Sequence, residues 1–199
     1  MHVILASGSP RRRELLTMLG VNFSVRPSHA DETVSPGVGP ADAVLELARR
    51  KARAVWGRLD AAERREAIVV AADTVVALDG DILGKPRDAD HALAMLKRLR
   101  GRAHRVYTGL CVRTVDAEEV AFAETEVHMR DRDDPWLERY VATGEPMDKA
   151  GAYAIQGYGS LLVASIAGDY YNVVGLPLGL LDEMFTRMGL ELTPLRPLT

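Results

Sequence analysis

The chain has 199 residues, 47% of them hydrophobic and 27% charged, which is enough to bury a substantial core. The length favours one domain or two tightly joined lobes, and we treat residues 1–199 as a single domain. The formal net charge of −3 excludes an overall positive field that would attract a nucleic-acid backbone, so an anionic ligand would need a local basic pocket. Cys111 is the only cysteine, which excludes an intrachain disulfide and a multi-cysteine metal site and fits a reducing compartment.

The N-terminal segment places a short apolar stretch before a run of arginines, which is the reverse of the order in a secretory signal. No later apolar run approaches the roughly 20 residues needed to cross a bilayer. We therefore expect a cytoplasmic protein without a membrane partner.

Hydrophobic periodicity predicts alternating strands and helices. In the first half we expect a strand at 3–6, a helix at 14–19 whose capped start is Ser9-Pro10, a helix at 41–56, and a strand at 67–78 that turns at Asp79-Gly80 into 81–83. In the second half we expect a helix at 88–99, an antiparallel hairpin of strands 105–114 and 120–129, a helix at 135–142, a loop or strand at 151–159, a strand at 161–166 and a helix at 178–188. This mixture indicates an α/β or α+β fold.

The loop after the first predicted strand has the composition of a phosphate-binding turn. Its sequence, SGSPRRR at residues 7–13, combines small residues, two hydroxyls and three arginines at a helix start. The alternative is a capped helix with a solvated basic turn. Cations at a helix N-terminus oppose the macrodipole by a few tenths to about 1 kcal/mol each, so a bound anion is favoured. Arg13 is the member we expect to face solvent.

Two further candidates lie in the middle of the chain. Asp73 interrupts an apolar strand, and because an unpaired buried carboxylate is costly, it needs a lysine, a metal ion or a catalytic water as a partner. Such a carboxylate can act as a general base or as an oxygen ligand for Mg²⁺, whereas a structural alternative is a strand-end turn with Thr74. Lys85, in a Gly-Lys-Pro loop, fits a surface lysine as well as it fits a phosphate ligand.

Other residue patterns carry little functional signal by themselves. Glu32 in an acidic pair and Lys51 on a helix are typical of solvated surface. Gly157-Tyr158-Gly159 lacks the third glycine of a dinucleotide fingerprint. The five histidines have no ligand spacing, and no G-x-S-x-G nucleophile motif is present.

Taken together, six segments in order resemble the signature blocks of the Maf family of nucleotide pyrophosphatases. They are LASGSPRR at 5–12, ADTVV at 72–76, GKP at 84–86, DKAGAY at 148–153, IQG at 155–157 and VGLPL at 174–178. The resemblance covers nearly the whole chain. It implies a mixed, bent β-sheet between two lobes with flanking helices, as in inosine triphosphate pyrophosphatases, and a nucleotide in the cleft.

The resemblance also implies an activity and a set of residues. The activity is Mg²⁺- or Mn²⁺-dependent hydrolysis of a nucleoside triphosphate between its α and β phosphates. The resemblance is also compatible with a homodimer. The implied triphosphate ligands are Ser7, Arg11 and Arg12. Glu32 and Asp73 would bind the metal and activate water, with Asp73 as the proton acceptor, while Lys51 and Lys85 would neutralise charge. Arg12, Thr74 and Gln156 match positions associated with base selection.

The IQG block resembles the dTTP/UTP enzymes of the family rather than those that prefer 7-methyl-GTP. The Gln156 amide offers one acceptor and two donors, enough for the O4 and N3–H edge that thymine and uracil share, although a flipped amide would also suit cytosine. Three alternatives remain open: a pyrophosphatase for modified nucleotides with a house-cleaning role, a regulatory nucleotide-binding protein of septum formation, and a nucleic-acid-binding protein. The near-neutral charge disfavours the last.

Overall fold

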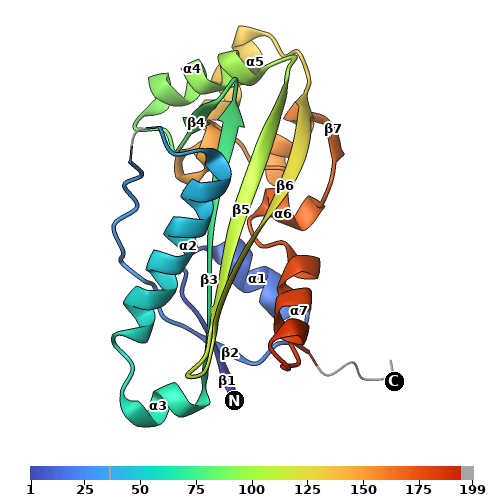
Figure 1. Ribbon diagram of the computed structural model, residues 1–199. Coiled ribbons are helices and arrows are strands. Elements are labelled where there is room, and N and C mark those ends of the chain that lie inside the picture. Colours follow the sequence, from blue (N-terminus) through green and yellow to red (C-terminus); the bar gives the residue numbers. More distant parts are fainter. Residues whose placement is uncertain (36, 194–199) are drawn as a thin grey trace, which may run out of the picture.

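The computed structural model describes residues 1–35 and 37–193, which form a single seven-stranded mixed sheet with helices on both faces (Figure 1). The strand order is β2-β1-β3-β5-β6-β7, and the short β4 pairs with β3. The strands are β1 (His2–Leu5), β2 (Phe23–Val25), β3 (Ala67–Leu78), β4 (Asp81–Leu83), β5 (Ala103–Arg113), β6 (Glu118–Met129) and β7 (Val163–Ala167).

Parallel and antiparallel pairings meet at β3. The first strand, β1, pairs in parallel with β2 and β3, whereas β3, β5, β6 and β7 are successively antiparallel. The three long central strands run the length of the molecule and link its two ends (Figure 1). The expected hairpin of β5 and β6 and the expected mixed α/β class are both confirmed.

The helices pack on both faces of the sheet and at one of its ends. Helix α2 lies along one face, α1 and α7 lie on the other, and α4 and α5 lie at the end of the sheet that is at the top of Figure 1. The α-helices are α1 (Pro10–Met18), α2 (Pro40–Trp56), α3 (Ala61–Glu66), α4 (Ala89–Leu99), α5 (Asp134–Ala142), α6 (Tyr170–Val174) and α7 (Leu178–Arg187). Three 3₁₀ helices are η1 (Glu145–Asp148), η2 (Ala150–Ala152) and η3 (Gly157–Leu162). No helix among the described residues is both long and apolar enough to span a bilayer.

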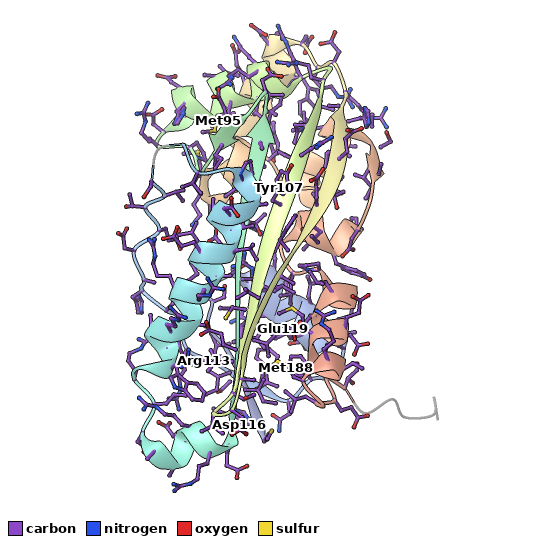
Figure 2. All side chains as sticks on the ribbon, in the orientation of Figure 1. Met95, Tyr107, Arg113, Asp116, Glu119 and Met188 are labelled. Carbon is purple, nitrogen blue, oxygen red and sulfur yellow. The ribbon has the colours of Figure 1, made fainter. Side chains whose placement is uncertain are left out.

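The buried side chains form two lobes at opposite ends of the long strands. At the β1 end, alternate residues of β1 and β3 pack against α1 and α7 on one face and against α2 on the other. At the far end, the last residues of β3 pack with α4 and α5. Figure 2 shows this separation, with Met95 of the far core and Met188 beside α7 at opposite ends of the sheet. The two cores are separate, and the pocket described below lies between them.

Most predicted elements are present, but the prediction for residues 151–159, a loop or a strand, is only partly confirmed. Residues 153–156 form no helix or strand, as the loop alternative expected, whereas 151–152 belong to η2 and 157–159 to η3, and no strand forms. The cause is local backbone conformation, since Gly151, Ala152 and Gly157 have positive φ values of 70°, 59° and 61° that no strand accommodates. The sequence reasoning also missed the short elements β2, α3 and α6.

Candidate active site

A pocket with a volume of about 740 Å³ lies between the two lobes. Residues from both lobes line it, including segments before α1, within β3 and after η2. All nine residues singled out from the sequence are among them: Ser7, Arg11, Arg12, Glu32, Lys51, Asp73, Thr74, Lys85 and Gln156. Their convergence from distant parts of the chain is a finding of the structure, whereas the chemical role of each one stays a prediction.

A buried lysine between two carboxylates forms the centre of the pocket. The Lys51 ammonium lies 2.5 Å from Asp73 Oδ1 and 2.7 Å from Glu32 Oε1. Lys51 and Asp73 are each only 7% exposed, so their charges are largely withdrawn from water and depend on each other. The partner that Asp73 required is therefore Lys51, the first of the three possibilities considered from the sequence.

Close packing of α2 on the sheet makes this contact possible. Asp73 on β3 is directly opposite Gly109 on β5. A Cβ atom at Gly109 would lie 2.3 Å from the backbone oxygen of Val44, so only glycine lets α2 approach so closely. Lys51 follows Val44 by two helical turns and projects from the same face of α2, which brings its ammonium to Asp73.

The rim of the pocket carries Glu32 and Lys85. The side chain of Glu32 is 51% exposed and that of Lys85 is 61% exposed, with 3.9 Å between Lys85 Nζ and Glu32 Oε2. Burial alone would raise the pKa of Glu32, but the hydrogen bond and charge of Lys51, with Lys85 and Arg12, lower it below its ordinary value. Glu32 is therefore held as a carboxylate beside two lysines.

Arg12 is fixed by contacts with three different segments. Its Nε donates to the Gly175 carbonyl oxygen at 2.7 Å, one terminal nitrogen donates to Ser7 Oγ at 3.2 Å, and the other donates to Thr74 Oγ1 at 3.1 Å. Burial lowers the pKa of the Arg12 guanidinium, and the nearby charge of Asp73 opposes that effect. These bonds use three of the five N–H donors of the guanidinium and leave two for a ligand.

The start of α1 presents donors to the same space. Ser9 occupies the N-cap position, but its side chain makes no capping hydrogen bond, so the backbone N–H groups of Arg11 and Arg12 in the first turn of α1 remain available to an anion. Arg11 lies 3.5 Å from the Asp148 carboxylate across the pocket, while Arg13 is exposed, as expected. A basic surface at a helix N-terminus therefore faces the Asp73 cluster.

The carboxylates offer a partial set of metal ligands. No group of three or more His, Cys, Asp or Glu side chains with metal-binding geometry occurs in residues 1–35 and 37–193. Asp73 Oδ2 has no partner among these residues and is not a fully buried atom, so it faces the pocket beside Glu32. One or two carboxylates completed by water and phosphate oxygens is the coordination that Mg²⁺ commonly adopts, so the donor set fits such a metal.

Comparison with known proteins identifies the family of this chain. The family model for Maf-like proteins matches residues 2–188. The chain belongs to the Maf family.

Several relatives of this family are similar along their whole length. A dTTP/UTP pyrophosphatase of Dictyoglomus turgidum is 50% identical over 193 residues, which cover 96% of this chain and 97% of the relative. A dTTP/UTP pyrophosphatase of Anaeromyxobacter dehalogenans is 49% identical over 199 residues, covering 98% of each. One from Symbiobacterium thermophilum is 50% identical over 187 residues, covering 94% of each.

From the sequence pattern alone, Lys51 was predicted to be a surface residue, and Asp148 and Lys149 were given no role. All three line the pocket. A signal for Lys51 was present in the sequence. It falls seven residues after Val44 and four before Val55, on the apolar face of α2, where a solvated lysine is unexpected. A charged residue in the middle of an apolar helical face predicts a buried partner, and here that partner is Asp73.

Proposed function

We propose that this Maf-family chain acts as one domain that hydrolyses dTTP and UTP to the nucleoside monophosphate and pyrophosphate. The observation that carries the proposal is the buried Asp73–Lys51 pair, which lies in one pocket with the basic N-terminus of α1. A carboxylate next to a phosphate-binding surface is suited to hydrolysis rather than to retention of a nucleotide. Relatives that are about 50% identical over nearly their whole length are named dTTP/UTP pyrophosphatases, which supports dTTP and UTP as the substrates.

In the proposed reaction, water attacks the α phosphorus while the bond to the β-phosphate oxygen breaks. The electron pair of that bond leaves with pyrophosphate, and the proton of the water passes to Asp73 Oδ2. Lys51 holds Oδ1, so it orients the carboxylate and keeps the other oxygen directed at the pocket. Asp73 then returns its proton to solvent after the products leave.

Charge on the triphosphate is balanced by groups on both sides of the pocket. Arg11, Lys85 and the free N–H groups of α1 can donate to phosphate oxygens as negative charge develops on pyrophosphate. Arg12 donates a hydrogen bond to Ser7 Oγ, and both side chains belong to the same phosphate-binding surface. Binding of the triphosphate to Arg11 replaces its contact with Asp148.

Glu32 would bind a divalent cation, Mg²⁺ or Mn²⁺, directly, and Asp73 would bind it through an intervening water, with further water and substrate oxygens completing the coordination. Such a cation polarises phosphate oxygens and lowers the pKa of bound water. The chain's own residues then need only orient the water and accept its proton.

Base selection is assigned to Gln156, Thr74 and Arg12, which line the same pocket. Gln156 is partly exposed, and its amide has no partner within the described residues, so it can pair with a base edge. Thr74 and Arg12 bond to each other and define the neighbouring wall. Gln156→Ala should lower the ratio of kcat/KM for dTTP to that for GTP, and an unchanged ratio would remove Gln156 from base selection.

The test of the reaction is pyrophosphate release from a panel of canonical and modified triphosphates with Mg²⁺ or Mn²⁺. We compare wild type with Asp73→Asn and with the control Asp79→Asn, which makes the same change in the turn that follows β3, in an exposed pair with Arg102. We expect turnover of dTTP and UTP that only Asp73→Asn abolishes.

Other outcomes would each point elsewhere. Near-normal turnover by folded Asp73→Asn would refute the role of Asp73. Turnover confined to a modified base would keep the mechanism and change the substrate, whereas nucleotide binding without turnover would favour a regulatory protein.

A further inference from the structure

A carboxylate outside the reacting centre anchors the loop that carries Gln156. Glu145, at the start of η1, accepts hydrogen bonds from the backbone N–H of Tyr158 at 3.0 Å and of Gly159 at 2.8 Å. The two N–H groups reach different oxygens, Oε2 and Oε1, and Oε1 also accepts from the Tyr140 hydroxyl at 3.0 Å. Glu145 does not line the pocket, so these contacts are internal to the protein.

These bonds satisfy the N-terminus of η3. The first N–H groups of any helix lack partners within it, and Gln156, the N-cap residue of η3, supplies no side-chain acceptor. Glu145 supplies one from another segment, and hydrogen bonds from backbone N–H groups to a carboxylate are about twice as strong as neutral ones. The carboxylate therefore fixes the direction in which η3 begins.

The two glycines of Gly157-Tyr158-Gly159 make room for this arrangement. Gly157 has a φ of 61°, and a Cβ atom there would lie 2.5 Å from Glu145 Oε2. A Cβ atom at Gly159 would lie 2.3 Å from the Ala154 backbone oxygen and 2.7 Å from the Tyr140 hydroxyl. The pattern that fails as a dinucleotide fingerprint thus serves close packing around a carboxylate.

Tyr140 and Glu145 bind the backbone on both sides of Gln156. The Tyr140 hydroxyl accepts from the backbone N–H of Ala154 at 3.4 Å and donates to Glu145, which in turn holds residues 158 and 159. Because the Gln156 amide has no partner within the described residues, the backbone on either side is what determines where that amide points.

We propose that Glu145 is a positioning residue for base selection, acting through Gln156 with the help of Tyr140. This inference rests on the proposed function, since it assumes that Gln156 contacts the base. It assigns Glu145 no contact with the nucleotide. Its removal should weaken discrimination between bases and leave the phosphate chemistry at the Asp73 cluster in place.

The test is Glu145→Gln, which keeps the shape of the side chain but turns an N–H₂ group toward one of the two backbone N–H donors. We expect the ratio of kcat/KM for dTTP to that for dGTP to fall about tenfold, through a higher KM for dTTP, with kcat at saturation within about twofold. The control Glu138→Gln makes the same change at an exposed position of α5 and should alter neither value.

A double-mutant cycle with Gln156→Ala decides whether Glu145 acts through Gln156. In that background Glu145→Gln should have no further effect on selectivity, and an equal effect there would overturn the proposal. A uniform loss of kcat for all triphosphates would overturn it as well. If Glu145→Gln does not fold, Tyr140→Phe, which removes one hydroxyl, should give a smaller change in the same direction.

Failure of the proposed function is separable from failure of this inference. A wild-type protein that turns over no triphosphate would refute the proposed function. In that case the ratio of dissociation constants for dTTP and dGTP, measured by calorimetry, replaces the kinetic ratio. An unchanged ratio in Glu145→Gln would then refute the positioning role.

Discussion

Replacing Lys51 by methionine directly tests the importance of the buried ion pair. The substitution keeps the length of the side chain but leaves Asp73, which is 7% exposed, without its cationic partner. Removing one partner of a buried ion pair costs about 3–5 kcal/mol. The Glu32 side chain is 51% exposed, so its share is small, and we expect a loss near the lower end, about 3 kcal/mol.

Urea unfolding followed by the fluorescence of Trp56 and Trp136 measures this loss. For a chain of 199 residues, 3 kcal/mol corresponds to a decrease in Tm of roughly 6–12 °C. The control is Lys97→Met, which removes a lysine whose side chain is 38% exposed in its pair with Asp134, and which should cost less than about 1 kcal/mol.

The loss should also depend on Asp73. Adding Asp73→Asn to Lys51→Met replaces the carboxylate that has lost its cationic partner by a neutral amide, so the double variant should recover part of the stability. A loss equal to that of Lys97→Met, unchanged by Asp73→Asn, would refute the buried-pair reasoning.

Two further predictions concern other parts of the fold. Burial lowers the pKa of His104 from 6.5 to about 4, so the unfolded chain binds a proton in that window that the folded chain does not, and stability falls as pH drops through it. The lowered pKa corresponds to a decrease of about 3 kcal/mol in the free energy of unfolding on acidification, measured by urea unfolding at a series of pH values. The variant His104→Gln should lack this decrease, and an identical pH dependence in that variant would contradict the role of His104. Gly109→Ala should destabilise the protein by about 1–3 kcal/mol and reduce kcat, because α2 must move away from β5 and carry Lys51 with it. A stable, fully active Gly109→Ala protein would show that α2 does not need this close approach.

Local patterns identified most of the long elements. The apolar spacing of α2, the apolar run of β3 on both sides of Asp73 and the Asp79-Gly80 turn each lie within a short segment, so the sequence alone is enough to predict them. Helix α3 was missed although its capping box, Asp60 with Glu63, is readable. In contrast, β2 has only three residues, too few to show a period, and it exists because β1 offers it an edge.

For the candidate site too, some residues could be identified from the sequence pattern and others could not. The phosphate-binding composition of residues 7–13 and the exceptional position of Asp73 follow from the sequence, because each is a conflict between a residue and its immediate surroundings. Resemblance to the Maf family added Glu32, Lys51, Lys85 and Gln156, which composition alone did not distinguish from surface residues.

Only the tertiary structure could show which of these residues meet. The pairing of Lys51 with Asp73 depends on α2 packing against β5 at a glycine that lies 36 residues beyond Asp73 in the chain (109 − 73). The anchoring of the Gln156 loop likewise depends on Glu145 and Tyr140, which belong to other elements. The sequence by itself determines most of the long elements and the chemical character of their side chains, because both depend on near neighbours. The distances between side chains are decided by long-range packing, in which one missing Cβ atom sets how closely a helix approaches a sheet.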